Sequence, residues 1–204
     1  MASSALQLLG FLISLIGVAA TVAATVMVEW TKNFRGEHRT YEGLWMECES
    51  DDIELWICET HQTLIKLPIE IQATRAVMLV SLFLSAVAVM VSVVGMKCTH
   101  FLDDVPDSKS KTALTGGILF MISGLLTIII TSWYVKMIVT ESGELDDKLR
   151  KEFGHAVFVN WAGGLLTVIG GIFLSCMRCC GTKSSVSRSP SQLLPTTKPK
   201  SNYV

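Results

Sequence analysis

The sequence predicts a mainly α-helical membrane protein, in which four transmembrane helices form a bundle with a small extracellular antiparallel β-sheet. Half of the 204 residues are hydrophobic and only 17% are charged, which is too apolar for a soluble domain of this size. Four long stretches contain no charge at all. Two cysteines lie on the long polar loop between the first two stretches.

Each apolar stretch is long enough to cross the ~30 Å hydrocarbon core of a bilayer, which takes about 20 residues in a helix. The first stretch lacks the basic start and the short length of a cleavable signal peptide. The sequence therefore predicts nine segments: a cytosolic N-terminus (1–5), the first span (6–28), a first extracellular loop (29–75), the second span (76–96), a cytosolic loop (97–112), the third span (113–135), a second extracellular loop (136–155), the fourth span (156–176) and a disordered cytosolic tail (177–204).

Four spans place both termini on one side of the membrane. Lysines and arginines do not decide which side this is, because nine lie on the two longer loops and eight on the opposite side. The tail after Cys176 carries five basic residues and no acidic one, which favours the cytosolic face and its anionic lipids. We therefore expect a multi-pass plasma-membrane protein with cytosolic termini.

The six cysteines divide into two groups. Cys48 and Cys58 are alone on the first loop, where an oxidising compartment favours a disulfide between them. The others lie at the opposite membrane face and are candidates for palmitoylation: Cys98, Cys176, Cys179 and Cys180. A metal site at the last three would lack a nearby histidine, so we predict neither a metal nor a cofactor.

Local patterns predict the structure of the loops. Tyr41–Met46 and Asp52–Ile57 have strand-like composition, and Leu64–Ile71 resembles a short turn or helix. Glu144–Phe153 has the charge spacing of a helical extension. Arg75 at a span end is interpreted as a snorkelling anchor or a partner for a loop carboxylate.

Aromatic and small residues mark the ends and the faces of the spans. Trp30 and Trp45 are expected to cover one face of the sheet or to meet the membrane boundary, where Trp133, Tyr134 and Trp161 are also expected. The glycines of the last two spans would let helices approach closely: Gly116, Gly117, Gly124, Gly163, Gly164, Gly170 and Gly171.

The last two residues, Tyr203 and Val204, form a candidate PDZ-binding end. A PDZ groove adds such a peptide as a strand and binds its carboxylate through backbone amides. The preceding residues, rich in Ser, Pro, Thr and Lys, cannot bury a core.

Trp30, the triplet Gly43-Leu44-Trp45, and Cys48 with Cys58 resemble the signature of the claudins, the four-span proteins of tight junctions. The resemblance covers nearly the whole chain and includes Gln72–Ala76, Gly95–Cys98 and the terminal Tyr203-Val204. It implies a left-handed four-helix bundle topped by a sheet from both loops. It also implies paracellular sealing or ion-selective pore formation, self-association in cis and in trans, tails bound to PDZ scaffold proteins, and acylated cysteines.

The first loop carries ten acidic and five basic residues. A narrow water path lined by this excess would attract cations. In cation-pore claudins the selectivity carboxylates occupy positions that correspond here to Asp51 and Glu59. Both are acidic, and ordinary solvated carboxylates are the alternative interpretation.

Two features depart from the claudin pattern. Ser142 and Gly143 stand where the second loop usually carries an aromatic pair, which in claudins receives a neighbour's side chain aligned here with Leu64. This predicts weak lateral polymerisation. The first loop is also short ahead of Gly43, which predicts the loss of part of a hairpin.

Two other functions remain as alternatives, and a third is not predicted. A claudin-type sealing protein shares every feature above. An auxiliary subunit of a receptor or channel is the second, because other four-span families share the tryptophan and cysteine core. The third, an enzyme, is not predicted, because the histidines are scattered and no catalytic motif is present. Membrane lipid is an expected partner and nucleic acid is not.

Overall fold

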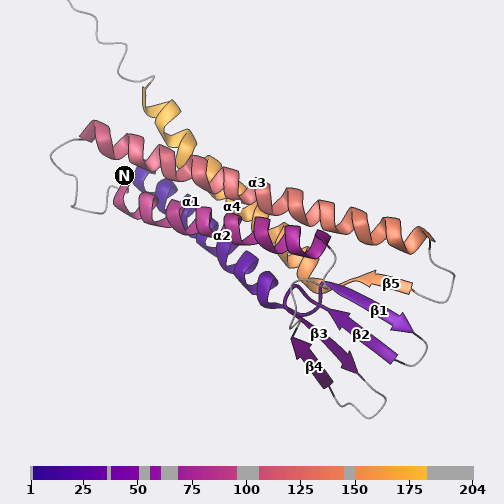
Figure 1. Cartoon of the computed structure of the whole chain (residues 1–204). Coiled ribbons are helices and arrows are strands. Elements are labelled where there is room, and N and C mark those ends of the chain that lie inside the picture. Colours follow the sequence, from indigo (N-terminus) through magenta and orange to yellow (C-terminus); the bar gives the residue numbers. More distant parts are fainter. Residues whose placement is uncertain are drawn as a thin grey trace, which may run out of the picture.

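The computed structural model describes residues 2–35, 38–50, 56–60, 69–95, 106–144 and 150–182. Within them lie four long helices and five short strands (Figure 1). The helices are α1 (Ala2–Val26), α2 (Ile69–Gly95), α3 (Pro106–Glu144) and α4 (His155–Thr182). The strands are β1 (Thr31–Arg35), β2 (His38–Glu42), β3 (Met46–Ser50), β4 (Trp56–Thr60) and β5 (Arg150–Phe153).

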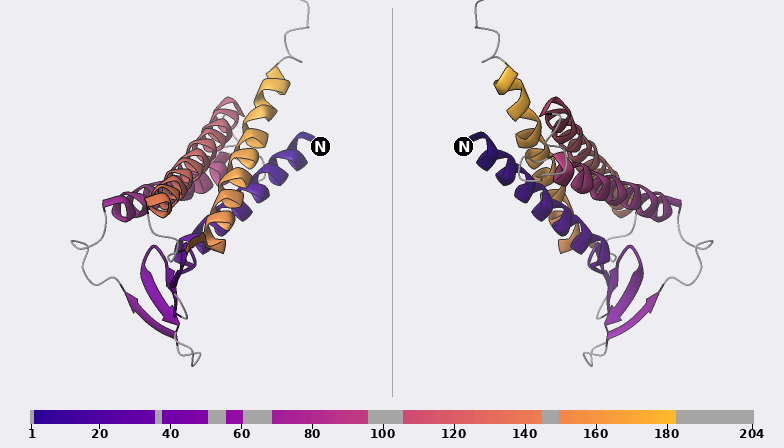
Figure 2. Two further views of the ribbon diagram at one scale, coloured as in Figure 1. Left: turned by 90° about the vertical axis from the view of Figure 1, so that its right-hand side faces the viewer. Right: turned by 90° about the vertical axis from the view of Figure 1, so that its left-hand side faces the viewer.

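All four helices are long and apolar enough to cross a membrane. The helix boundaries differ from those of the predicted spans. Helix α1 ends at Val26, before the predicted end at Val28, and α3 extends beyond the predicted 113–135 at both ends. The sheet lies beyond one end of the bundle, and the N-terminus lies at the other end (Figure 2).

Helix α4 packs against both α1 and α3, whereas α2 packs mainly against α3. Glycines allow these close approaches, because a Cβ at Gly17 in α1 would lie 2.7 Å from the carbonyl oxygen of Gly163 in α4. A Cβ at Gly124 in α3 would lie 2.8 Å from that of Gly164 in α4. The small residues therefore serve helix packing, as the sequence predicts.

Buried hydroxyl and amide groups connect α2, α3 and α4. The hydroxyl oxygens of Ser81 and Thr127 lie 2.7 Å apart, and Nδ2 of Asn160 donates to Oγ1 of Thr131 at 2.6 Å. Polar contacts of this kind contribute to association in lipid, where the hydrophobic effect does not act between helices.

The five strands form one antiparallel sheet in the order β4-β3-β2-β1-β5, so strands from both loops combine. Strands β1 and β2 pair as a hairpin, with register from Thr31 opposite Glu42 to Arg35 opposite His38. The predicted loss of part of a hairpin relative to the claudin pattern stays a prediction. The residues present between Trp30 and Gly43 suffice for two paired five-residue strands.

Two predicted loop elements are wrong. Tyr41–Met46 is not one strand, because β2 ends at Glu42 and the chain turns through Gly43, Leu44 and Trp45. The predicted helix over Glu144–Phe153 is not formed as such, because α3 ends at Glu144. Residues Arg150–Phe153 form strand β5 and pair with β1. Pairing with β1 outweighs helical charge pairs, which contribute only ~0.2–0.5 kcal/mol each.

Two other predictions are only partly covered. Of the predicted strand Asp52–Ile57, the described part begins at Trp56, which opens β4. Of the predicted turn or helix Leu64–Ile71, the described part begins at Ile69, which opens α2.

Candidate functional site

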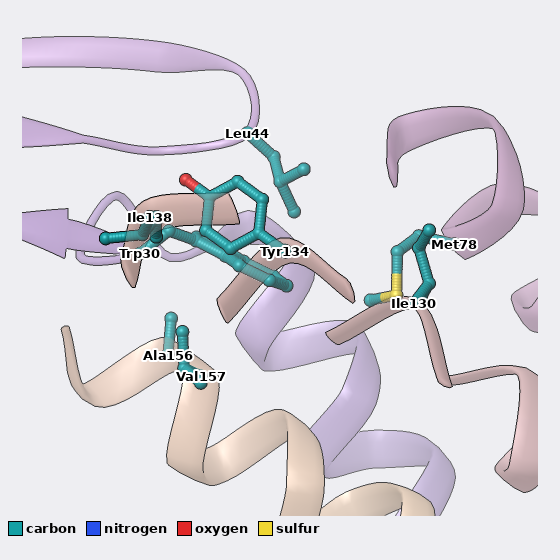
Figure 3. Close-up of a cluster of buried hydrophobic side chains, with 8 residues drawn as sticks. All are labelled: Trp30, Leu44, Met78, Ile130, Tyr134, Ile138, Ala156 and Val157. Carbon is teal, nitrogen blue, oxygen red and sulfur yellow. The ribbon is translucent and has the colours of Figure 1, made fainter. Parts of the chain in front are cut away.

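The sheet is attached to the bundle through a buried hydrophobic cluster around Trp30 (Figure 3). Trp30 is 0% exposed, and its indole Nε1 donates to the Ala24 carbonyl oxygen at 2.9 Å. We call this cluster the seat of the sheet; its members are Trp30, Leu44, Met78, Ile130, Tyr134, Ile138, Ala156 and Val157. Trp30 thus belongs to the buried core that joins the sheet to the bundle.

Tyr134 links α3 to the first strand. Its ring meets Trp30 edge to face, with centroids 5.4 Å apart, and its hydroxyl lies 3.0 Å from Oγ1 of Thr31. Tyr134 faces the seat and not lipid, because its ring is buried among the seat residues. Its neighbour Trp133 is exposed, as a boundary residue would be.

Backbone hydrogen bonds join the start of α4 to the segment after α1. The Gly154 amide donates to the Trp30 carbonyl oxygen at 3.0 Å, and the Ala156 amide donates to that of Glu29 at 3.1 Å. A side chain at Gly154 would overlap the Glu29 carbonyl oxygen. Only glycine therefore permits this close approach between the two segments.

The Gly43-Leu44-Trp45 turn closes the seat from the sheet side. The Gly43 amide donates to the Met46 carbonyl oxygen at 2.9 Å, and Leu44 is buried among the seat residues. The guanidinium carbon of Arg75 lies 5.3 Å from the centroid of the Trp45 ring. Arg75 is thus buried against a tryptophan and does not extend its guanidinium into water.

A disulfide joins Cys48 in β3 to Cys58 in β4, as predicted. The two residues are directly opposite in the antiparallel register. The bond therefore fixes β4, at the edge of the described sheet, against its neighbour β3.

Four carboxylates lie on one face of the sheet. Glu42, Glu47 and Glu59 are directly opposite one another across β2, β3 and β4, and Glu49 follows Glu47 on the same face. Asn33 lies on this face too, because its Nδ2 donates to Oε1 of Glu42 at 2.8 Å. Glu49 and Glu59 are exposed, so this face presents concentrated negative charge to solvent.

The opposite face has a different character. It carries the disulfide together with Lys32, Arg39, Tyr41 and Glu152. Lys32 lies 3.4 Å from the Glu29 carboxylate, and its ammonium lies 5.6 Å from the centroid of the Tyr41 ring. The negative charge of the described strands is therefore concentrated on one side of the sheet.

Several predicted site residues lie outside the described part of the chain: Asp51, Leu64, Cys98, Tyr203 and Val204. Cys176 is a free, exposed thiol on α4, and the backbone of Cys179 and Cys180 continues the same helix. Ser142 and Gly143 belong to the last turn of α3. Among the described side chains, no group of three or more His, Cys, Asp or Glu is arranged to bind a metal.

Three site features escaped sequence reasoning. These are the contact of Arg75 with Trp45, the role of Tyr134 in the seat, and the alignment of Glu47 with Glu59. The last had a signal in the sequence, because a disulfide between directly opposed cysteines also aligns the residues that flank them.

A four-helix membrane bundle whose one end carries a disulfide-linked sheet from two loops defines a class of four-span membrane proteins. The model of the PMP-22/EMP/MP20/Claudin family matches residues 4–174. The chain is 36% identical to Claudin-7 of Rattus norvegicus over the whole of both chains. It is 40% identical to Claudin-19 of Mus musculus, over 86% of this chain and 82% of the relative. It is 37% identical to Claudin-1 of Mus musculus, over 93% of each chain.

The chain therefore belongs to the claudin family of tight-junction membrane proteins. The resemblance drawn from Trp30, the Gly43-Leu44-Trp45 triplet and the cysteine pair is confirmed, and so is the claudin-like fold.

Proposed function

We propose that this claudin controls paracellular permeability and that the acidic face of its sheet favours the passage of cations. The alignment of Glu59 with Glu47 and Glu42 across three strands is the observation that carries the proposal. Asp51 is proposed as a second selectivity carboxylate.

The spacing of the carboxylates gives the face its electrostatic strength. Directly opposed residues in an antiparallel pair have Cβ atoms ~4.5–5.5 Å apart, well within the Debye length of about 8 Å at physiological salt. Their fields therefore add. A confined water path along this face would concentrate cations and repel anions.

The proposed orientation places the sheet outside the cell and both termini in the cytosol. The Cys48–Cys58 disulfide supports this orientation, because such bonds persist in oxidising compartments.

The proposed partners follow the family pattern. This claudin associates with other claudins in cis and in trans, with Leu64 in the lateral contact. Tyr203 and Val204 bind PDZ scaffold proteins of the tight junction. Palmitoyl chains on Cys98, Cys176, Cys179 and Cys180 hold the cytosolic ends of the helices to the membrane.

Dilution potentials across a claudin-null epithelial layer test the proposal. Expression of the chain should raise the sodium-to-chloride permeability ratio, and Glu59→Gln should lower it again. Asp51→Asn tests the second carboxylate in the same way. Glu152→Gln is the matched control, because Glu152 lies on the opposite face of the sheet.

Raised resistance without a change in the permeability ratio would assign the chain to the sealing claudins. An equal effect of Glu152→Gln and Glu59→Gln would contradict the role of the acidic face. Absence of junctional strands and of any change in resistance, with a receptor or channel copurifying at fixed stoichiometry, would favour an auxiliary subunit.

A further inference from the structure

Arg75 is the one buried residue that carries a formal charge among those whose side chains the structure describes. It is 6% exposed and lies about one turn inside the membrane-length stretch Ile71–Gly95 of α2. A buried charge strongly destabilises a protein unless it is paired and hydrogen-bonded. The guanidinium of Arg75 therefore needs a partner that neutralises its charge and accepts its hydrogen bonds.

Two of its nitrogens, Nε and Nη2, have no hydrogen-bond partner in the described part of the chain. These two N–H groups lie on the same edge of the planar guanidinium. That edge binds both oxygens of a phosphate or carboxylate side-on. The Trp45 ring contacts the guanidinium but accepts neither hydrogen bond in the plane of the group. The unpaired edge thus has the geometry of an oxyanion receptor.

The location of this edge identifies the oxyanion. Trp45 is 37% exposed, as suits a tryptophan at the membrane boundary. One turn further along α2, Leu79 is 50% exposed, and Phe83 follows at 69%. An apolar helix surface for acyl chains therefore begins directly beside Arg75. At this depth the oxyanion that accompanies acyl chains is the phosphate of a phospholipid.

We propose that Arg75 and Trp45 form a binding site for the phosphate group of a membrane phospholipid, whose acyl chains lie along Leu79 and Phe83. Nε and Nη2 are buried in the structure, so a neighbouring side chain must move before the phosphate reaches them. The bound lipid neutralises the charge of Arg75 beside the seat of the sheet. The site is independent of the ion selectivity proposed above.

Native mass spectrometry of the full chain in mild detergent tests the site. The probes are dioleoylphosphatidylcholine, a galactosyl diacylglycerol without phosphate, and inorganic phosphate. We expect tight binding of one phosphatidylcholine and weak binding of the other two. Arg75→Met should raise the apparent Kd by about tenfold, the order expected for lost charge-assisted hydrogen bonds. Lys136→Gln, an exposed cation at the same end of the bundle, should change nothing.

Equal binding of phosphatidylcholine by the Arg75→Met variant would overturn the proposal. Equal binding of the galactolipid would do so too, because that lipid offers no phosphate. Binding of inorganic phosphate that depends on Arg75, without a preference for phosphatidylcholine, would overturn the lipid assignment.

A second measurement uses the protein without substitutions, so its main result does not depend on the folding of a variant. In phosphatidylcholine liposomes, solid-state NMR on arginine-labelled protein should place one Cζ about 4 Å from a lipid phosphorus, as bidentate contact requires. The fold-preserving change Arg75→Lys should remove that signal and no other. A Cζ that lies instead beside a carboxylate carbon of a second, differently labelled copy would overturn the proposal.

Discussion

The seat of the sheet and the strands beyond it are held by different kinds of contact. In the seat, Trp30, Leu44 and Tyr134 are buried, and each fits a space defined by several helices. In β3 and β4, Glu49, Ile57 and Glu59 are exposed, and backbone pairing and one disulfide hold the strands. Packing therefore fixes where the sheet stands, while the side chains that face solvent are free to differ in charge.

Removal of the Trp30 ring should have the largest effect, because it leaves a cavity in the seat and an unpaired Ala24 carbonyl. We expect Trp30→Ala to lower the free energy of unfolding by ~3–5 kcal/mol. Calorimetric unfolding in detergent measures the change. Trp133→Ala is the control, because Trp133 is exposed. An equal loss of unfolding free energy in that variant would contradict the importance of the seat for stability.

Loss of the disulfide should affect the strands and spare the seat. The double change Cys48→Ala with Cys58→Ala should cost about 2–4 kcal/mol of sheet stability, since a short loop is no longer closed in the unfolded state. Hydrogen exchange should accelerate in β3 and β4 and stay unchanged in α2 and α3. Faster exchange throughout the bundle would show that the two regions are not separable.

The contact between Thr31 and Tyr134 lies where the two regions meet. Tyr134→Phe and Thr31→Val should each cost about 1 kcal/mol, the usual net contribution of a buried hydrogen bond. Because the two hydroxyls bind one another, the double variant should lose less than the sum. Additive losses of stability in thermal unfolding would mean that each hydroxyl has its main hydrogen-bond partner elsewhere.

The smallest effect on stability should come from the acidic face of the sheet. Removal of one of its charges should stabilise the protein, whereas the changes above destabilise it. Glu47→Gln should stabilise the β3–β4 pair by ~0.2–1 kcal/mol, because Glu47 lies directly opposite Glu59. Hydrogen exchange at low salt measures this gain, which should fall at high salt as screening increases. Glu49→Gln is the control, because Glu49 lies opposite Ile57. A gain at Glu49 as large as at Glu47 would contradict a pairwise origin.

The sequence predicted the elements that depend on local composition. The four apolar stretches gave the helices, because a membrane span needs only length and apolar character. The cysteine pair and the triplet around Leu44 gave the disulfide and the family.

The errors arose where distant contacts decided the structure. Arg150–Phe153 has the charge spacing of a helix, yet β1 supplies an edge to which it pairs. Tyr134 resembles a boundary residue in its own span, and only the position of Trp30 after α1 explains its burial. The row of carboxylates required the strand register, which sequence spacing alone did not settle.

Strand β5 has a consequence for the biosynthesis of the protein. It pairs with β1 at one edge of the sheet, but it is translated after α3 and directly before α4. Strands β1 to β4 and their disulfide can therefore form early, while the edge of β1 stays open until the third helix has been inserted. That edge is open to premature pairing with a strand of another chain. The fourth helix then fixes β5 in place through Gly154.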